Sequence, residues 1–465
     1  MRLSSYIIFV PLEDRDETIL VHGISGAVDR VSNEWARNLR MTRWDRFSEQ
    51  DLEDMLRRGY ITRKTVEEER ELAIRIGRAL RAKAVRSSSF IFMPTLKCNL
   101  GCDYCFQNFL RTEANAAPSV DTRMVDAALR AMAALQELRG GRVNRILLFG
   151  GEPLLAANRP VLAHLFGKGT DLGYRFDAVT NGTELHHYRD YLGPGILESV
   201  QITLDGPQEV HDRQRWARDG QGTYWQIKQN IDMALALGVH ISLRMNVGWE
   251  TRDAIRELVA EFDRYGWLGH RGFSAYCAPI RGKGGQAEST RLQRAVIQLV
   301  NEINAAYRPR YGRAVVAMAG GTLRMKIASL LRENLLSALT PAYCGAHLNM
   351  FVFAADGAIY TCWEGVGIPS ARVGRFWPDL ELDEESLNRW FERHSLNIPA
   401  CQRCRYMFFC SGGCGIHALE HNEDFYSPYC DGFAELFRHH VQQAIAQLTD
   451  LDDTPIHHEL GYVTE

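Results

Sequence analysis

Residues 90–105 read FIFMPTLKCNLGCDYC, in which an apolar run leads into three cysteines, Cys98, Cys102 and Cys105, with the spacing CxxxCxxC. The run is typical of a buried β-strand. A [4Fe–4S] cube normally takes four Cys ligands, so three thiolates leave one of its irons open for chemistry. The segment therefore predicts a reactive cluster at the end of a strand.

The rest of the central sequence repeats one pattern, in which a short apolar run is followed by an amphipathic segment of helix length, such as residues 120–138 and 251–265. This alternation is typical of βα units around a parallel sheet. The motifs KCNLGC, GGEP, TNGT, LDGP and RMN follow the expected strands, and active sites of such folds lie at that end of the sheet. We expect an α/β fold with a partial (β/α)6 TIM-like barrel. Its strands are expected at residues 90–95, 146–149, 176–180, 199–204, 240–247 and 272–278.

The barrel is expected to span residues 86–285, with different segments on either side. Residues 1–85 predict a small α+β domain, because three short apolar runs precede two charged helical stretches, the second broken near Gly59. Residues 281–289 predict a flexible loop at the end of the barrel, or a lid over the substrate. The remaining expected units are a helical bridge over residues 286–340, a cysteine-rich domain over 341–432, and a helix with a polar tail over 433–465.

The composition excludes several classes of protein. The chain has 465 residues, 46% of them hydrophobic and 24% charged, and is long enough to bury a full core. Its formal net charge of −3 gives no general attraction to nucleic acid or to an anionic membrane. The first apolar run has only about five residues, too few for a signal peptide or a membrane span. Its 11 cysteines without an export signal favour metal or cluster ligation in the reducing cytoplasm over disulfides.

Four motifs together resemble the radical S-adenosylmethionine (SAM) superfamily: CNLGCDYC, GGEP at residues 150–153, TNG at 180–182 and LDGP at 204–207. The alternative is that three buried cysteines and a glycine turn merely pack. The resemblance implies that SAM binds the open iron through its amino and carboxylate groups, and that one electron from the cluster cleaves it to methionine and a 5′-deoxyadenosyl radical. Such a radical removes hydrogen from an unactivated C–H bond, while the protein supplies position and excludes water.

The same resemblance implies contacts with the cofactor. Glu152 is expected to hold the ammonium group of SAM by a charge-assisted hydrogen bond, while Gly150 and Gly151, before Pro153, let the backbone approach closely; a plain βα turn is the alternative. Polar residues at later strand ends are candidates for ribose, carboxylate or substrate contacts, although such residues also commonly close strands. Two aromatic residues are candidates to flank adenine or to form a hydrophobic wall. The polar candidates are Asn181, Asp205, Arg244 and Asn246, and the aromatic candidates are Tyr104 and Phe106.

Seven further cysteines form a second pattern in residues 344–430. The first two are arranged as Cx12Gx4C, and four others follow as Cx2Cx5Cx3C before the last. The pattern resembles the SPASM extension of radical SAM enzymes, which implies two auxiliary [4Fe–4S] clusters and three clusters in all. Structural zinc is the alternative, because CxxC pairs also hold zinc. The resemblance assigns Cys344, Cys362 and Cys414 to the first auxiliary cluster, and Cys401, Cys404, Cys410 and Cys430 to the second.

Two auxiliary cubes need about eight thiolates, one more than this segment offers, so the first cluster lacks a fourth cysteine. An open iron, a ligand other than cysteine, or Cys277 could complete it. Cys277 ends the sixth expected strand, where we expect it to face the barrel mouth. It is also a candidate hydrogen donor to a substrate radical, as in related peptide epimerases, and an inert buried cysteine is the alternative.

SPASM proteins chiefly act on peptides, so the resemblance implies an enzyme that modifies a ribosomally made precursor peptide, with an external one-electron reductant such as flavodoxin or ferredoxin. A carbon–carbon, ether or thioether crosslink is the leading expectation, because auxiliary clusters can accept a second electron, and residues 1–85 are a candidate leader-binding domain. Sulfatase maturases carry Asp directly after the cysteine of Gx4C, where this chain has Trp363, although Glu364 could replace that base. Epimerisation, a small-molecule substrate, and a non-enzymatic electron-transfer or zinc-scaffold protein are the alternatives.

Overall fold

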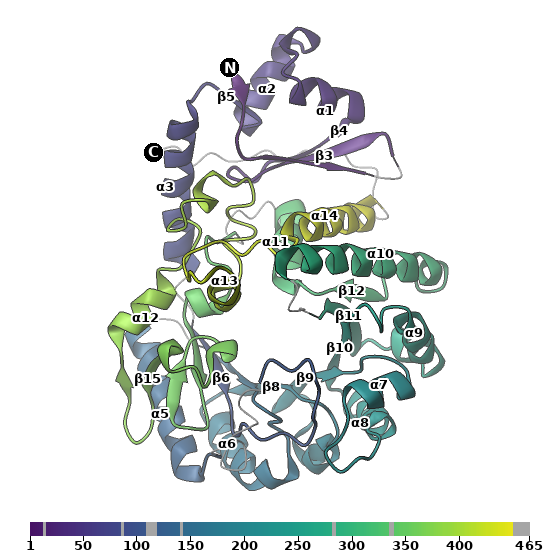
Figure 1. Cartoon of the computed structure of the whole chain (residues 1–465), viewed down its shortest axis with the longest axis vertical. Helices are drawn as coiled ribbons and strands as arrows, with labels where there is room; N and C mark the ends of the chain where they lie inside the picture. Colours follow the sequence, from purple (N-terminus) through teal and green to yellow (C-terminus); the bar gives the residue numbers. More distant parts are fainter. Residues whose placement is uncertain are drawn as a thin grey trace.

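The computed structural model describes residues 1–12, 15–84, 88–107, 119–139, 143–280, 285–333 and 339–449 (Figure 1). Its central sheet has 11 strands in the order β12-β11-β10-β9-β8-β7-β6-β13-β14-β15-β16. Strands β6 to β12 each run parallel to their neighbours and curve into an open arc, which confirms the predicted partial barrel. They are β6 (Ser89–Phe92), β7 (Arg145–Leu148), β8 (Arg175–Val179), β9 (Leu197–Thr203), β10 (His240–Val247), β11 (Phe273–Pro279) and β12 (Val316–Met318).

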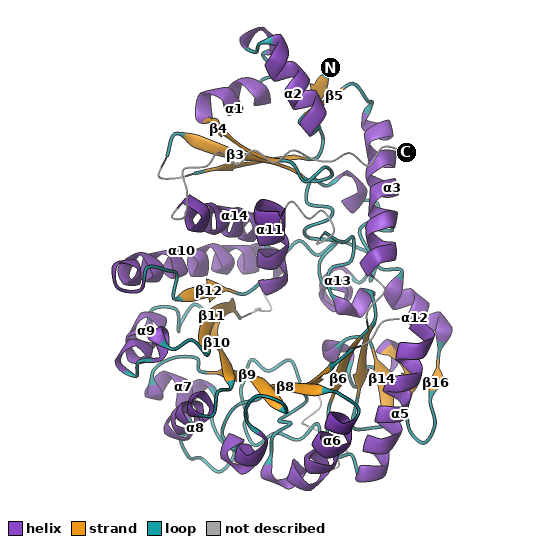
Figure 2. Ribbon diagram, turned by 180° about the vertical axis from the view of Figure 1, so that it is seen from behind, coloured by secondary structure: helices purple, strands orange, loops and turns teal. Residues whose placement is uncertain are grey.

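Strand β10 explains why the arc has one apolar and one polar face. Successive side chains of a strand point to opposite faces, and Ile241, Leu243 and Met245 are fully buried in the core that the strands share with the surrounding helices. Arg244 and Asn246 lie on the other face. The helices on the outside of the arc are α5 (Thr122–Arg139), α6 (Arg159–Asp171), α7 (Gln208–Gln214), α8 (Tyr224–Ala236) and α9 (Ala254–Arg264) (Figure 2).

The predicted helical bridge holds a seventh parallel strand that the sequence did not reveal. Strand β12 pairs with β11 and lies between α10 (Gly285–Tyr311) and α11 (Gly321–Glu333). Three residues are too few to show the periodicity of a strand. The prediction of a loop at residues 281–289 was wrong from residue 285 onward, because the chain is helical there. Residues 281–284 lie outside the described ranges.

The cysteine-rich segment continues the sheet of the barrel. Strand β13 pairs in parallel with β6, the strand that precedes the first three cysteines, and the following strands are antiparallel. The first three and the later seven cysteines are therefore joined through one sheet. The elements of this segment are β13 (Met350–Phe353), β14 (Ala358–Tyr360), β15 (Arg372–Arg375), β16 (Glu381–Leu382), α12 (Glu384–Phe391) and α13 (Gly415–Asn422).

The N-terminal residues form the predicted strands followed by helices. One face of the antiparallel sheet β2-β3-β4 packs on α1 and α2, and its other face packs on α11, α14 and the segment 407–409. Figure 1 shows successive layers, formed by the β2-β3-β4 sheet, α14, α10 and β12. Within the described ranges, we find no helix with the length and apolar character of a membrane span. The elements are β1 (Arg2–Leu3), β2 (Ile7–Pro11), β3 (Glu17–His22), β4 (Val28–Ser32), α1 (Asn33–Arg40), α2 (Glu49–Arg58), β5 (Ile61–Thr62), α3 (Val66–Ala84) and α14 (Phe433–Thr449).

Candidate iron–sulfur and cofactor site

The first three cysteines lie in a loop that follows β6 at the carboxyl end of the parallel strands. Cys98 and Cys105 pack against a small buried group that includes Cys102 and Ala217. The loop is held by the chain just after α7, because the Gly101 amide donates to the Trp216 carbonyl oxygen at 2.9 Å. A Cβ on Gly101 would lie 2.2 Å from the Trp216 ring, so a larger residue would require that exposed ring to move. The three thiols form a compact donor set that fits a three-cysteine cluster.

Tyr104 anchors this loop to the ends of β9 and β10. Its hydroxyl donates to the Asp205 carboxylate and accepts from Arg215 Nη1 at 2.6 Å and from Asn246 Nδ2 at 3.1 Å. Burial raises the pKa of both Tyr104 and Asp205, and the nearby Arg215 guanidinium opposes that effect. These hydrogen bonds hold the loop together, and the expected roles of Tyr104 beside adenine and of Asp205 in cofactor contact stay predictions. Nothing in the sequence pattern marked Arg215.

The inner face of the arc carries a second polar group. Arg244 Nε donates to Asn246 Oδ1 at 2.7 Å, and on the neighbouring strand the Tyr276 hydroxyl donates to Gln201 Oε1 at 2.7 Å. The strand register places Arg244 beside Tyr276. These side chains line the interior below the cysteine loop, where ribose, carboxylate or substrate contacts are expected.

Glu152 is a fully buried carboxylate at the end of β7. Oε1 accepts from the Leu154 amide at 2.9 Å and from the Thr180 hydroxyl at 2.6 Å, and Oε2 accepts from the Asn181 amide at 2.6 Å. Burial raises its pKa to about 7, against the lowering effect of these hydrogen bonds. A carboxylate so poised gains from a cationic partner such as an ammonium group.

The two glycines of the GGEP motif allow close packing of the backbone, and their expected approach to the ligand stays a prediction. Gly150 has a φ of 136°, and a Cβ there would lie 2.4 Å from the Thr95 carbonyl oxygen. A Cβ on Gly151 would lie 2.3 Å from the Lys97 carbonyl oxygen. The glycines thus let the motif press against the chain that leads into the cysteine loop, while the Pro153 carbonyl accepts from Asn158 Nδ2 at 2.9 Å.

Asn181 connects the third strand of the arc to the same loop. Its Nδ2 donates to Asn99 Oδ1 at 2.7 Å and lies 3.9 Å from Cys98 Sγ. Asn99 in turn donates to Thr183 and to Glu184. The amide of Asn181 therefore stands beside a candidate iron ligand, as a residue that contacts the cluster or its bound ligand would.

An aromatic wall joins the cysteine loop to the later cysteines. The Phe106 ring, which is 44% exposed, lies 6.4 Å from the Phe149 ring between centroids. Phe149 stacks on Trp363 at 5.7 Å, and Trp363 directly follows Cys362. This geometry favours the wall, rather than an adenine clamp, for Phe106.

The seven later cysteines influence one another's ionisation in two sets, and their roles as cluster ligands stay a prediction. Burial raises the pKa of the Cys362 thiol, and Cys344 and Cys414 raise it further. Likewise, burial raises the pKa of Cys401 to about 12, with added effects of Cys404 and Cys430, and these three thiols also act on Cys410. Thiols that oppose one another's ionisation are stabilised as thiolates when a metal binds them. Both donor sets therefore fit metal clusters.

Two buried cations, which sequence reasoning missed, lie between these groups. The Arg393 side chain is fully buried and donates to the carbonyl oxygens of Gly413 at 2.7 Å and Ser427 at 3.0 Å. Lys326 Nζ donates to the Phe408 carbonyl oxygen at 3.3 Å, and burial lowers its pKa to about 8 against the effect of the nearby thiols. Both compensate negative charge that thiolate clusters would bring.

Cys277 lies on the opposite face of β11 from Tyr276, so its expected position at the barrel mouth was wrong. It pairs in register with Met245 and Met318, is fully buried, and belongs to the core shared with the outer helices. Burial raises the pKa of its thiol to about 12. The prediction failed because side chains alternate between the two faces of a strand, so that an error of one residue reverses the face. This placement separates Cys277 from both the candidate substrate and the later cysteines.

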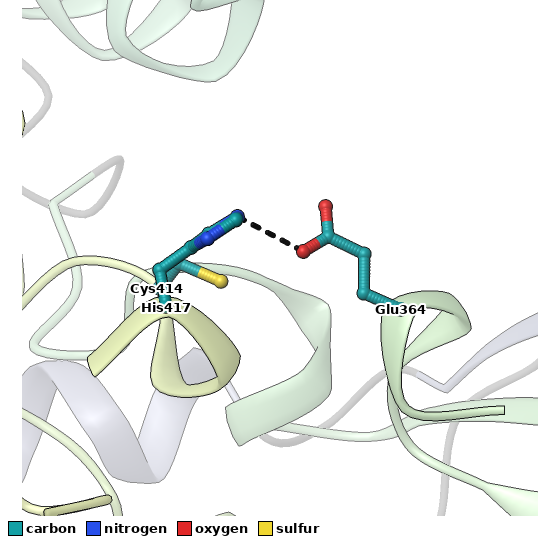
Figure 3. Close-up of side chains that lie close together, drawn as sticks. All are labelled: Glu364, Cys414 and His417. Carbon is teal, nitrogen blue, oxygen red and sulfur yellow. Dashed lines mark ion pairs between the residues drawn. The ribbon is translucent and has the colours of Figure 1, made fainter. Parts of the chain in front are cut away.

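Glu364 lies at the first auxiliary group. Its Oε2 is 3.0 Å from His417 Nε2, and the side chains of Glu364, Cys414 and His417 point toward one another (Figure 3). The ligand atoms of these three residues lie within 4.8 Å of one another. His417 Nδ1 lies 3.2 Å from Glu420 Oε2. His417 follows Cys414 by three residues at the start of α13, and no motif had marked it.

Comparison with known proteins agrees with this site. The family model of the radical SAM superfamily matches residues 92–262. The cysteine-type anaerobic sulfatase-maturating enzyme of Clostridium perfringens is 23% identical over 358 residues, covering 74% of this chain and 93% of that enzyme. A GTP 3′,8-cyclase of Rhizobium etli is 26% identical over 152 residues, which is 32% of this chain and 40% of that protein.

Solved structures share the fold over a longer part of the chain. Native anSMEcpe with bound AdoMet aligns with a TM-score of 0.57 at 17% identity, over 78% of this chain and all of that one. Streptococcus suis SuiB bound to S-adenosylmethionine aligns with a TM-score of 0.51 at 16% identity, over 93% of this chain and 99% of that one. The family match covers the cysteine loop, Glu152 and the strands β9 and β10. Residues 92–262 therefore carry a radical SAM domain, and the chain is an enzyme.

Proposed function

We propose that this enzyme is a SPASM-type peptide maturase that removes hydrogen from a residue of a precursor peptide and installs a crosslink. The observation that carries the proposal is the gathering of seven later cysteines into two groups beside the radical SAM domain. The proposed enzyme has three [4Fe–4S] clusters, one at the first cysteine loop and two at these donor sets. Bound SAM would supply a 5′-deoxyadenosyl radical after one electron arrives from an external reductant such as flavodoxin or ferredoxin.

The residues of this chain have positioning roles in that reaction. Glu152 would pair with the ammonium group of SAM, and Asn181 would contact the ligand beside Cys98. Arg244 and Asn246 would face ribose, carboxylate or substrate from the inner face of the arc. A crosslink removes two hydrogens from the peptide: one leaves as an atom to 5′-deoxyadenosyl, and the other as a proton with an electron that an auxiliary cluster accepts.

A peptide substrate is supported by the fold neighbours and by the aromatic wall. One anSMEcpe structure contains a bound Kp18Cys peptide, and one SuiB structure contains its precursor peptide SuiA. In this chain, the stacked rings of Phe149 and Trp363 lie between the two cysteine regions. A peptide side chain bound against these rings would lie between the radical and the electron acceptor.

A leader segment of the peptide has a candidate site at the N-terminal domain. A cavity of about 400 Å³ is bordered by Phe9, Arg40, Arg405, Tyr406 and Arg438, together with Leu3 and Ile8. Arg40 lies 4.3 Å from the centroid of the Phe9 ring, and burial, Arg405 and Arg438 lower its pKa. Guanidinium groups that repel one another favour an anionic ligand. We propose that acidic leader residues bind here, and that Arg40→Gln with Arg405→Gln weakens peptide binding without altering SAM cleavage.

Co-expression with a short peptide encoded beside this gene tests the function. Mass spectrometry of the peptide is expected to show a loss of two hydrogens, and a Cys98→Ala variant is the matched control. An unchanged mass with one deuteron gained in heavy water would contradict the crosslink and indicate epimerisation. An unmodified peptide would contradict the choice of substrate.

Sulfatase maturation is the second candidate, because the Clostridium perfringens relative is similar over most of its own length. Trp363 replaces the expected Asp, and Glu364 is already paired with His417. A cysteine-containing sulfatase peptide, incubated anaerobically with reconstituted enzyme, SAM and reductant, is expected to stay unchanged in mass. A mass change would favour this second function.

A further inference from the structure

We propose that Glu364 is the fourth ligand of the cluster at Cys344, Cys362 and Cys414, and that His417 fixes its carboxylate. This inference rests on the auxiliary clusters of the proposed function. It answers a question that the cysteine count leaves open, because the first auxiliary group has three thiols and a [4Fe–4S] cube has four irons to ligate.

The position of Glu364 is the first support. It is two residues after Cys362, in a turn that begins at that cysteine. Its carboxylate and Cys414 Sγ belong to one set of ligand atoms that lie within 4.8 Å of one another. Figure 3 shows the carboxylate and the thiol of Cys414 directed toward the same space.

The chemistry of the ligand is the second support. Iron accepts carboxylate oxygen as well as thiolate sulfur, as mononuclear sites with two histidines and one carboxylate demonstrate. A carboxylate ligand keeps the same formal charge as the thiolate that it replaces. The half-buried Glu364 side chain, 21% exposed, is therefore suited to close the coordination of an iron.

His417 has the geometry of a supporting residue. Nε2 lies 3.0 Å from Glu364 and Nδ1 lies 3.2 Å from Glu420, so both ring nitrogens face a carboxylate. The ring also stacks on Tyr429 at 5.4 Å between centroids, which holds its plane. Carboxylate ligands of metals are commonly held by such hydrogen bonds. The imidazole thus orients Glu364.

No cysteine remains for the role. Of the 11 cysteines, three belong to the first loop and seven to the two auxiliary groups, and Cys277 lies on the outer face of β11. With Glu364 in place, the first auxiliary cluster is closed to direct binding of substrate. Its role is then to accept an electron.

The test uses reconstituted full-length protein with Cys98, Cys102 and Cys105 all changed to Ala, so that only auxiliary clusters remain. Cyanide is the probe for an open iron, read by electron paramagnetic resonance after reduction. We expect cyanide to leave the spectrum of the parent protein unchanged. Glu364→Gln is expected to respond, or to lose about one iron per chain and show an oxidised [3Fe–4S] signal. Glu364→Cys supplies a thiolate and is expected to resist.

Glu420→Gln is the matched control, since it makes the same change at the other partner of His417 and is expected to leave the spectrum unaltered. A parent that responds to cyanide as strongly as Glu364→Gln would overturn the ligand assignment, as would a Glu364→Gln protein identical to the parent in iron content and spectrum. A parent without iron would contradict the auxiliary clusters of the proposed function, and the ligand with them. The spectroscopic readout therefore separates the two failures.

Discussion

The ring of Trp363 stacks on the ring of Phe149, with 5.7 Å between centroids and 30° between planes. Phe149 directly precedes the GGEP motif, and Trp363 directly follows Cys362, a candidate ligand of the first auxiliary cluster. One contact thus connects the radical-generating site to the candidate electron acceptor. Since β13 also pairs with β6, both the sheet and the aromatic wall fix the spacing of these two centres.

Replacing Trp363 should uncouple radical formation from product formation. The Trp363→Ala variant removes an aromatic pair worth about 1 kcal/mol, so the fold should persist while the substrate loses one wall of its passage. We expect the yield of modified peptide per 5′-deoxyadenosine to fall about tenfold. The check is to quantify both products by mass spectrometry, with Trp363→Phe as a control that keeps the ratio. A constant ratio in both variants would mean that the wall does not guide the substrate.

Glu152 predicts a pH dependence of stability in the absence of SAM. Burial raises its pKa from the ordinary value of 4.5 to about 7 in the folded protein, so the folded state holds the proton more tightly than the unfolded chain does. Stability therefore falls as the pH rises from 4.5 to 7, by up to about 3 kcal/mol from this group. Urea unfolding at pH 5 and pH 8 should show a smaller loss in Glu152→Gln than in the unmodified protein. Equal losses in both proteins would be the contradictory result.

Arg393 should be essential for the cysteine-rich segment. Its removal leaves several buried carbonyl oxygens without a donor, including those of Gly413 and Ser427, at a cost of about 1 to 3 kcal/mol for each. Arg393→Met is expected to lower the thermal midpoint and to lose both auxiliary clusters, as measured by iron content. The control is Arg389→Met, since Arg389 is exposed on the neighbouring helix. Full iron content in Arg393→Met would show that the guanidinium is dispensable.

Cys277→Ala should keep both the iron content and the product. The thiol is buried on the outer face of β11, so its loss creates only a small cavity, worth about 1 kcal/mol. Reconstitution followed by iron analysis and peptide mass spectrometry gives the answer. Loss of product with iron intact would restore the hydrogen-donor hypothesis for this cysteine.

The sequence predicted the features that depend on local pattern. The six longer strands of the arc were found from their apolar runs. The two groups of later cysteines were implied by the resemblance to the SPASM extension. The strand β12 was missed because three residues carry no period. The predicted face of Cys277 was wrong because a shift of one residue along a strand moves a side chain to the other face. The pairing with neighbouring strands determines which face is correct.

Contacts between distant segments account for the rest. Arg215, Arg393, Lys326 and His417 acquire their roles only when the chain folds, and none stands in a motif. Gly150 and Gly151 were recognised as a motif, but their close approach to the backbone of residues 95–97 could not be predicted. Tyr104 was a candidate to flank adenine or to form a hydrophobic wall, and the hydrogen bonds of its hydroxyl with Asp205 and Arg215 could not be predicted.

The most direct test of the central claim is the cleavage of SAM by the anaerobically reconstituted enzyme. With SAM and a one-electron reductant, chromatography with mass detection should find 5′-deoxyadenosine and methionine in equal amounts. The variant in which Cys98, Cys102 and Cys105 are all alanine should form neither product, while it keeps its auxiliary iron. Absence of 5′-deoxyadenosine from the fully reconstituted enzyme, or equal formation by the variant, would contradict the account.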